Sequence, residues 1–193
     1  MTTYFEDQII ARAGLATLQE HLAALSSHIG QLQNSRGRLM QWLEDASLDV
    51  CGSGTSGVGR DAATKLSYYV KGPVVGFLLD ARIRRATDGK SSLDDVMRLA
   101  YRRYAGERGF TPEQFRATAE EVAGVPLDEW YRKAVASTDE LDYGEALDWF
   151  GLRFVPNDDS KKAWKLEARE DASPAQKEHF RVWVSSGAPR NLE

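Results

Sequence analysis

The segment that most constrains the fold of this chain is an apolar run between Pro73 and Ile83. Its apolar residues point to nearly every side of a helix, and such a helix is stable only when other elements surround it. Proline has no backbone N–H and a fixed φ, so we expect the helix to begin just before Pro73. The run predicts a central helix in a multi-helical domain.

Signals for the start and end of helices recur on both sides of this run. Thr17 with Glu20, and Thr111 with Gln114, have the spacing of capping boxes, and Pro112 takes the first helical position. Glycines that follow apolar periodic segments are typical of helix C-termini. The helices expected from these signals lie in segments 2–15, 17–39, 91–106, 111–124, 126–138 and 142–151. The sequence therefore predicts a mainly α fold.

The last forty residues show a different pattern. Segments 163–169 (AWKLEAR) and 180–187 (FRVWVSSG) each have the composition of a strand, and the turn-like EDASPAQ separates them. Residues 153–193 are therefore expected to form a short tail that contains β-structure. Two readings of the tail stay open, a β-hairpin and a truncated remnant of a following domain.

Composition is that of an ordinary globular protein. The chain has 193 residues, of which 42% are hydrophobic and 28% charged, with a formal net charge of −4. This balance gives no reason to expect a nucleic-acid partner, and no apolar stretch is long enough to span a bilayer, so no membrane partner is expected. Cys51 is the single cysteine, which rules out an internal disulfide. Because no signal peptide opens the chain, we expect it in the cytoplasm as it stands.

Two further patterns in the sequence could indicate binding sites. The stretch Cys51–Lys65 contains the Gly-x-Gly-x-x-Gly spacing, but it lacks the preceding strand that a dinucleotide site needs, and we expect a flexible loop. His21 and His28 are seven residues apart on one expected helix, too far for an i, i+4 metal pair, and His179 stands alone. We therefore expect partly exposed helix histidines and no metal site in this chain.

Tyr68, Tyr69 and Lys71 lie at the N-terminal end of the central helix. Backbone N–H groups point outward at such an end, and the helix dipole favours negative charge there. A phenol in this place can donate a hydrogen bond to an oxyanion that develops in a cleft. The alternative is that both tyrosines are amphipathic residues at the rim of the core. The residues alone leave both readings open.

A longer series of motifs favours the first of these two interpretations of the tyrosines. Segment 67–104 (SYYVKGPVVGFLLDARIRRATDGKSSLDDVMRLAYRRY), segment 109–152 and the first fifteen residues occur in an order that resembles the glycyl aminopeptidase family of gluzincin zinc metallopeptidases. Members of that family often carry a C-terminal PDZ domain. The resemblance covers residues 1–152 and implies the multi-helical C-terminal lobe of a thermolysin-like gluzincin catalytic domain, followed by the tail 153–193.

The resemblance also implies roles for individual residues. Tyr69 matches the gluzincin tyrosine that stabilises the tetrahedral intermediate of peptide hydrolysis. Tyr68 then packs beside it, while Lys71 and Gly72 shape the start of the helix, and these three residues form part of the wall of the substrate cleft. Pro73 departs from the family, which more often has a small residue at this position.

The zinc-binding elements of the family are absent from the 193 residues. There is no His-Glu-x-x-His motif, and the glutamate that supplies the third ligand is expected a couple of residues before Met1. The resemblance therefore implies zinc for a full-length family member and no metal or other cofactor in this chain. A truncated gene, a misplaced start codon and a deliberately shortened chain would each explain this.

Two functional hypotheses follow. In the first, the chain is the C-terminal helical portion of a zinc aminopeptidase that acts on peptides; it supplies a cleft wall and the transition-state tyrosine and is inactive alone. In the second, it is a free-standing, non-catalytic helical interaction module. The surface left open by the missing half is expected to form a homodimer, or to be covered by the tail. The residues named for the open surface are Tyr4, Phe5, Ile9 and Ile10, and those for the cover are Trp164, Phe180 and Trp183.

Overall fold

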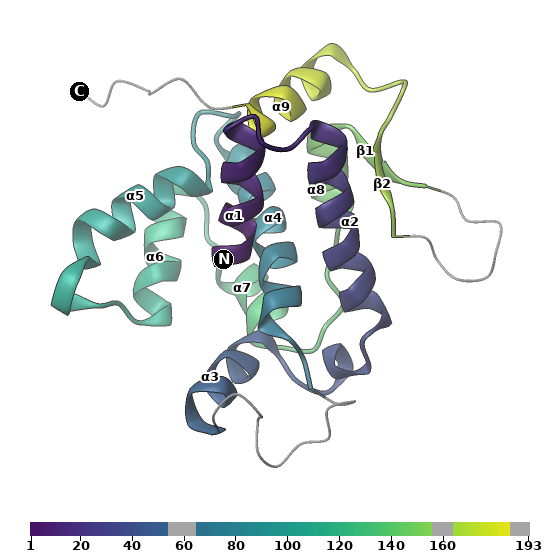
Figure 1. The fold of residues 1–193 in the computed structure, drawn as a ribbon. Coiled ribbons are helices and arrows are strands. Elements are labelled where there is room, and N and C mark those ends of the chain that lie inside the picture. Colours follow the sequence, from purple (N-terminus) through teal and green to yellow (C-terminus); the bar gives the residue numbers. More distant parts are fainter. Residues whose placement is uncertain (54–64, 156–163, 186–193) are drawn as a thin grey trace.

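The computed structural model describes residues 1–53, 65–155 and 164–185, which form helices around one central helix (Figure 1). The helices are α1 (Thr2–Arg12), α2 (Leu18–Asn34), α3 (Leu43–Ser53), α4 (Tyr68–Ala86), α5 (Leu93–Tyr104), α6 (Pro112–Ala123), α7 (Asp128–Val135), α8 (Gly144–Phe150) and α9 (Pro174–Val184). Short 3₁₀ helices span Arg36–Leu39 and Gly106–Arg108. The strands β1 (Leu152–Phe154) and β2 (Leu166–Ala168) pair antiparallel. The expected mainly α fold is confirmed.

Helix α4 is the predicted central helix. Every residue from Lys71 to Ala81 is buried, and α1, α2, α3, α5, α6 and α8 all contact it. Its start was predicted wrongly, because α4 begins at Tyr68, five residues before Pro73. Pro73 lies inside the helix, where its missing N–H removes only the backbone bond to the carbonyl of Tyr69 in the first turn. The packing of α4 on six neighbouring helices outweighs that loss.

The predicted helix caps are present. Thr17 accepts a hydrogen bond from the N–H of Glu20, whose carboxylate accepts one from the N–H of Thr17 at 2.7 Å. The corresponding pair Thr111 and Gln114 starts α6, and Gly124 ends it with φ of +68°. These contacts are local in sequence, so they could be read without knowledge of the tertiary structure.

The tail differs from its prediction. Segment 163–169 contains β2 as expected. Residues 180–184 of the expected strand 180–187 instead belong to helix α9, which begins at Pro174, and residues 186–187 lie outside the described residues. Ser173 and Gln176 form a capping box around Pro174, the same Ser/Thr-Pro-x-Gln pattern that starts α6. The partner of β2 is β1, at the end of the helical part. The division into 1–152 and 153–193 stays a prediction, and its boundary lies within β1.

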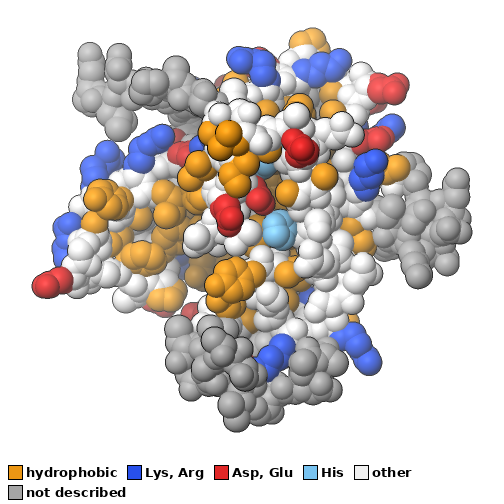
Figure 2. All heavy atoms as spheres, viewed as in Figure 1, with side chains coloured by type: hydrophobic (Ala, Val, Ile, Leu, Met, Phe, Trp, Pro, Cys, Tyr) orange, Lys and Arg blue, Asp and Glu red, His pale blue; other side chains and the backbone are white. Residues whose placement is uncertain are grey.

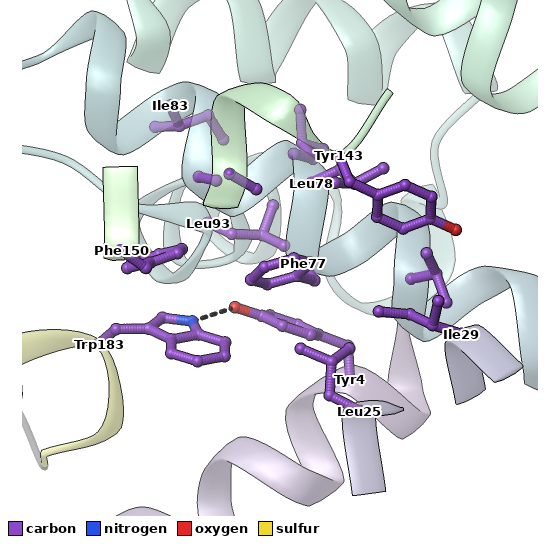
Figure 3. Close-up of a cluster of buried hydrophobic side chains, with 14 of the residues drawn as sticks. Tyr4, Leu25, Ile29, Phe77, Leu78, Ile83, Leu93, Tyr143, Phe150 and Trp183 are labelled. Atoms are coloured by element: carbon purple, nitrogen blue, oxygen red, sulfur yellow. Dashed lines mark hydrogen bonds between the residues drawn. The ribbon is translucent and has the colours of Figure 1, made fainter. Parts of the chain in front are cut away.

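The C-terminal helix contributes to the core. Trp183 is fully buried, and its ring lies 4.7 Å from that of Phe150 and 5.4 Å from that of Phe77 (Figure 3). Its indole N–H donates a hydrogen bond to the hydroxyl of Tyr4 at 3.0 Å. Residues from both ends of the chain therefore meet over α4.

The surface expected to be open on α1 is partly covered. Tyr4 is buried, and Phe180 and Trp183 of α9 are buried as well, whereas Ile9 and Ile10 remain exposed at 60% and 38%. Helix α9 of the tail therefore covers Tyr4, whereas Trp164, the third residue named for the cover, packs near Tyr143 and Phe154. Formation of a homodimer stays a prediction.

Helix α1 packs closely on α4 at Gly76. A Cβ atom at this position would lie 2.9 Å from Cγ of Tyr4, whereas a Cβ at Gly30 in α2 would meet only Trp164 Cβ, at 3.9 Å. We expect Gly76→Ala to lower the free energy of unfolding by about 1–3 kcal/mol through overpacking, although alanine favours helix. The matched change Gly30→Ala should raise it by about 0.5–1 kcal/mol. Urea denaturation measures both, and equal effects at the two sites would contradict this account of the contact.

Candidate active site

The two candidate tyrosines lie on the first turn of α4. Their rings are 4.2 Å apart between centroids and tilted by 34°. Tyr69 is 60% exposed, and Tyr68 is half-buried. The structure therefore gives the two residues different positions: Tyr69 is largely exposed, and the half-buried Tyr68 packs beside it. Their roles at a substrate stay a prediction.

Lys71 and Gly72 follow the two tyrosines in α4, and both are buried. The side chain of Lys71 is buried, and its Nζ donates a hydrogen bond to the carbonyl of Ser137 at 3.3 Å. Burial lowers the pKa of Lys71, and the nearby Asp139 and Glu140 partly offset that effect. Gly72 faces the start of α1, since a Cβ there would lie 3.4 Å from the nitrogen of Met1. Both residues thus shape the start of α4, and their contact with a substrate stays a prediction.

An apolar pocket opens beside the tyrosines. Its volume is about 460 Å³, and one face of α4, formed by Tyr68, Gly72, Val75 and Leu79, lines it. Figure 2 shows hydrophobic side chains gathered between the α5–α6 pair and the start of α1. The other lining residues come from the start of α1, from α3, and from the region of α6 and α7: Met1, Leu43, Glu44, Ser47, Leu48, Phe110, Pro112, Phe115, Trp130, Tyr131 and Val135. This lining was not foreseen, because its residues are spread over more than 130 positions and carry no motif.

One carboxylate lies in this apolar lining. Glu44, in the first turn of α3, lines the pocket together with Tyr131. Burial raises the pKa of Tyr131, and the negative charge of Glu44 adds to this rise. The pocket is therefore a mainly apolar cavity whose lining includes one carboxylate side chain, Glu44, and the N-terminal residue Met1.

The three histidines have separate surroundings in the described part of the chain. Within residues 1–53, 65–155 and 164–185, no group of three His, Cys, Asp or Glu side chains could hold an ion. His28 pairs with Asp7 at 3.3 Å, and His179 stacks on Trp149 with ring centroids 3.6 Å apart. His21 was expected to be partly exposed, but it is buried against Trp183. Helix α9, which was predicted as a strand, provides that cover.

The burial of His21 predicts a dependence of stability on pH. Burial lowers its pKa below the usual value of about 6.5, so the unfolded chain takes up a proton that the folded chain does not. We expect the free energy of unfolding to be largest above pH 7 and to fall as the pH drops below 6.5. The variant His21→Gln should show a shallower decline in urea titrations between pH 7.5 and about 5.5. His179→Gln serves as the control, and a slope equal to that of His21→Gln would contradict the assignment.

In the glycine-rich segment Cys51–Lys65, which was expected to be a loop, residues 51–53 instead form the end of helix α3. Residues 54–64 lie outside the described residues, and the loop expected there stays a prediction. Among the described helices, none is long and apolar enough to cross a membrane.

Comparison with known proteins bears on the tyrosine turn directly. Residues 1–75, from α1 through the first two turns of α4, match the sequence profile of the M61 glycyl aminopeptidase family. This part of the chain is therefore similar to the M61 glycyl aminopeptidases. The matched segment contains Tyr68, Tyr69, Lys71 and Gly72, and it confirms the resemblance for the part of the chain that carries the candidate site.

A solved structure agrees on the fold. The aminopeptidase N family protein from Idiomarina loihiensis superposes with a TM-score of 0.70 at 21% sequence identity. The alignment covers 78% of this chain and 26% of that protein, so the chain spans about a quarter of its length. At this identity the comparison establishes the fold of the chain and leaves its activity open. A search of curated proteins found no match.

Proposed function

We propose that this chain is the C-terminal helical portion of a zinc-dependent aminopeptidase, in which it supplies part of the wall of the substrate cleft and the tyrosine that stabilises the transition state. The observation that carries the proposal is the family match over residues 1–75, which ends within α4 after the exposed Tyr69. An exposed phenol at a helix N-terminus, beside an apolar pocket, has the chemistry that such a role needs.

The position of α1 supports the same proposal. By the family resemblance, the third zinc ligand precedes α1 in sequence. Met1, the N-cap residue of α1, lies against Gly72 of α4. Residues upstream of Met1 would therefore approach the first turn of α4. The described residues offer no metal-binding group of their own, so zinc would be held by residues that precede this chain. When bound, zinc supplies the activation of water and the polarisation of the peptide carbonyl.

Within this proposal the contribution of the chain is electrostatic. The hydroxyl of Tyr69 donates a hydrogen bond to the carbonyl oxygen of the peptide as that oxygen gains negative charge. Tyr68 limits the rotation of Tyr69 by packing against its ring. Lys71 holds the same turn of α4 to the segment after α7, through the carbonyl of Ser137. The substrates of the proposed aminopeptidase are peptides.

The chain by itself should not be a metallopeptidase. A catalytic zinc site takes about three protein ligands in fixed geometry, and the described residues do not supply them. We expect purified protein to contain far less than one zinc per chain and to show no chelator-sensitive cleavage of aminoacyl substrates. Elemental analysis after dialysis against zinc measures the first quantity. Stoichiometric zinc together with chelator-sensitive cleavage would refute the proposed division of roles.

The second candidate function is a free-standing, non-catalytic helical interaction module. The exposed side chains of Ile9 and Ile10 on α1 favour it, because they offer an apolar surface to a partner. Reading the genomic sequence upstream of Met1 separates the two candidates. An in-frame His-Glu-x-x-His followed by a glutamate supports the peptidase, and its absence supports the module.

A further inference from the structure

The apolar pocket beside α4 has the shape of a side-chain binding site. Val75 and Leu79, both buried in α4, line it together with residues from α3, α6 and α7. A volume of about 460 Å³ lies within the range of small-ligand pockets and exceeds the needs of one aromatic side chain. Leu48 and Phe110 at the rim are 67% and 57% exposed, so a ligand can bury apolar surface there that is now in contact with water.

The charge of the lining restricts the ligand further. Among the described residues, the lining contains one acidic side chain, Glu44, and no lysine or arginine. A ligand with a carboxylate beside its apolar group would bring two negative charges together at the edge of a low-dielectric cavity. A neutral group, such as a peptide amide, meets no such repulsion. The lining therefore favours an apolar group inside a longer peptide over the same group next to a free carboxylate.

Tyr68 connects this pocket to the candidate site. It lines the pocket, and its ring packs on that of Tyr69. A peptide residue whose side chain enters the pocket past Tyr68 would leave its backbone near the phenol of Tyr69. We propose that the pocket receives a large apolar side chain of the substrate peptide, and that Glu44 selects peptides in which this residue is followed by an amide over peptides that end there in a carboxylate. This inference rests on the proposed function, and it defines the substrates as oligopeptides.

Binding can be tested on this chain without zinc or upstream residues. The probes are N-acetyl-phenylalaninamide, N-acetyl-alaninamide and N-acetyl-phenylalanine, which differ in side-chain size or in the terminal charge. Methyl NMR of Leu43, Leu48, Val75, Leu79 and Val135 reports on the pocket, because these residues line it. We expect a Kd of about 1 mM for the phenylalanine amide. The alanine amide and the phenylalanine carboxylate should each bind at least about threefold more weakly.

Matched variants separate the roles of shape and charge. Glu44→Gln should bring the carboxylate probe to within about twofold of the amide, with little change for the amide itself. Ser47 is exposed on α3 and lines the pocket, so Ser47→Trp should block it and weaken the amide by about tenfold or more. Ser27→Trp, at an exposed serine on α2 outside the lining, is the control and should leave binding unchanged.

Met1 also lines this pocket, and burial lowers the pKa of its amino group, which can carry a positive charge in the free chain. The titrations are therefore repeated with a Gly-Ser extension before Met1, which converts this amine into an amide. Discrimination against the carboxylate should persist or increase in the extended chain.

Three results would overturn the inference: equal affinity for the phenylalanine and alanine amides, shifts confined to methyl groups outside the lining, or discrimination against the carboxylate that survives Glu44→Gln. None of them depends on zinc or turnover. If the pocket fails these tests while Tyr69 proves essential for turnover in the complete enzyme, the proposed function stands and the pocket proposal falls. If the pocket binds as expected while Tyr69 proves dispensable, the proposed function fails in its stated form and the pocket remains a binding site for apolar peptide side chains.

Discussion

Replacing Tyr69 by phenylalanine should lower the turnover number of a peptidase that contains this chain by roughly 100-fold to 1,000-fold, the range for loss of one hydrogen-bond donor to an oxyanion. The KM for the peptide should change much less, because the lost hydrogen bond forms mainly in the transition state. The exposed position of Tyr69 supports this expectation, since removal of its hydroxyl leaves no buried group without a partner. Steady-state kinetics of the chain joined to a zinc-binding N-terminal half measures both constants.

The neighbouring tyrosine gives the matched control. Tyr68→Phe removes the same atom from the adjacent residue, which is half-buried and lines the apolar pocket. Its effect on turnover should be much smaller, within about tenfold, because its proposed role is packing. Equal losses from the two substitutions would show that the hydroxyl of Tyr69 is not the specific donor.

The largest effect on stability is expected at Asp80, in the middle of α4. Its side chain is 1% exposed and accepts hydrogen bonds from the hydroxyl of Tyr4 at 2.8 Å, from Nε of Arg84 at 2.9 Å and from the backbone N–H of Leu93 at 2.7 Å. Asp80→Ala should lower the free energy of unfolding by about 3–5 kcal/mol, because it leaves the buried guanidinium of Arg84 without its main partner. Urea denaturation at neutral pH measures the change.

An exposed pair of the same kind is the control. Glu121 accepts two hydrogen bonds from Arg103, each at 2.8 Å, on the outer faces of α6 and α5. Glu121→Ala should lower the free energy of unfolding far less than Asp80→Ala, because water replaces the lost partner and screens the charge that remains. A cost for Asp80→Ala no greater than that for Glu121→Ala would mean that Arg84 finds another partner in the core.

The position of Asp80 could not be read from the sequence. The run Pro73–Ile83 predicted a buried helix, and an aspartate inside it gave no indication of its partners. Tyr4 and Leu93 come from segments 76 residues before it and 13 residues after it. Only the packing of α1 and α5 on α4 brings these donors to one carboxylate.

The wrong prediction of a strand in place of α9 has a different cause. The alternating apolar residues of 180–187 predicted a strand, while the Ser-Pro-x-Gln pattern at 173–176 indicates a helix start as clearly as the one at 111–114. The local signal was present, and the wrong prediction followed from weighting periodicity over capping. The buried His21 was missed for the same reason, since its cover is Trp183 on α9.

Sequence alone was sufficient for the features that depend on neighbours a few residues apart: the helix caps, the terminal glycines and the central position of α4. The family relation and the candidate Tyr69 were also readable, because they rest on motifs of consecutive residues. The tertiary structure was needed to find the pocket and the hydrogen bonds around Asp80. It was also needed to see that Tyr69 is exposed whereas Lys71 is buried. These features join residues from distant helices, and the free energy that places them comes from burial and hydrogen bonding between helices, which no local pattern encodes.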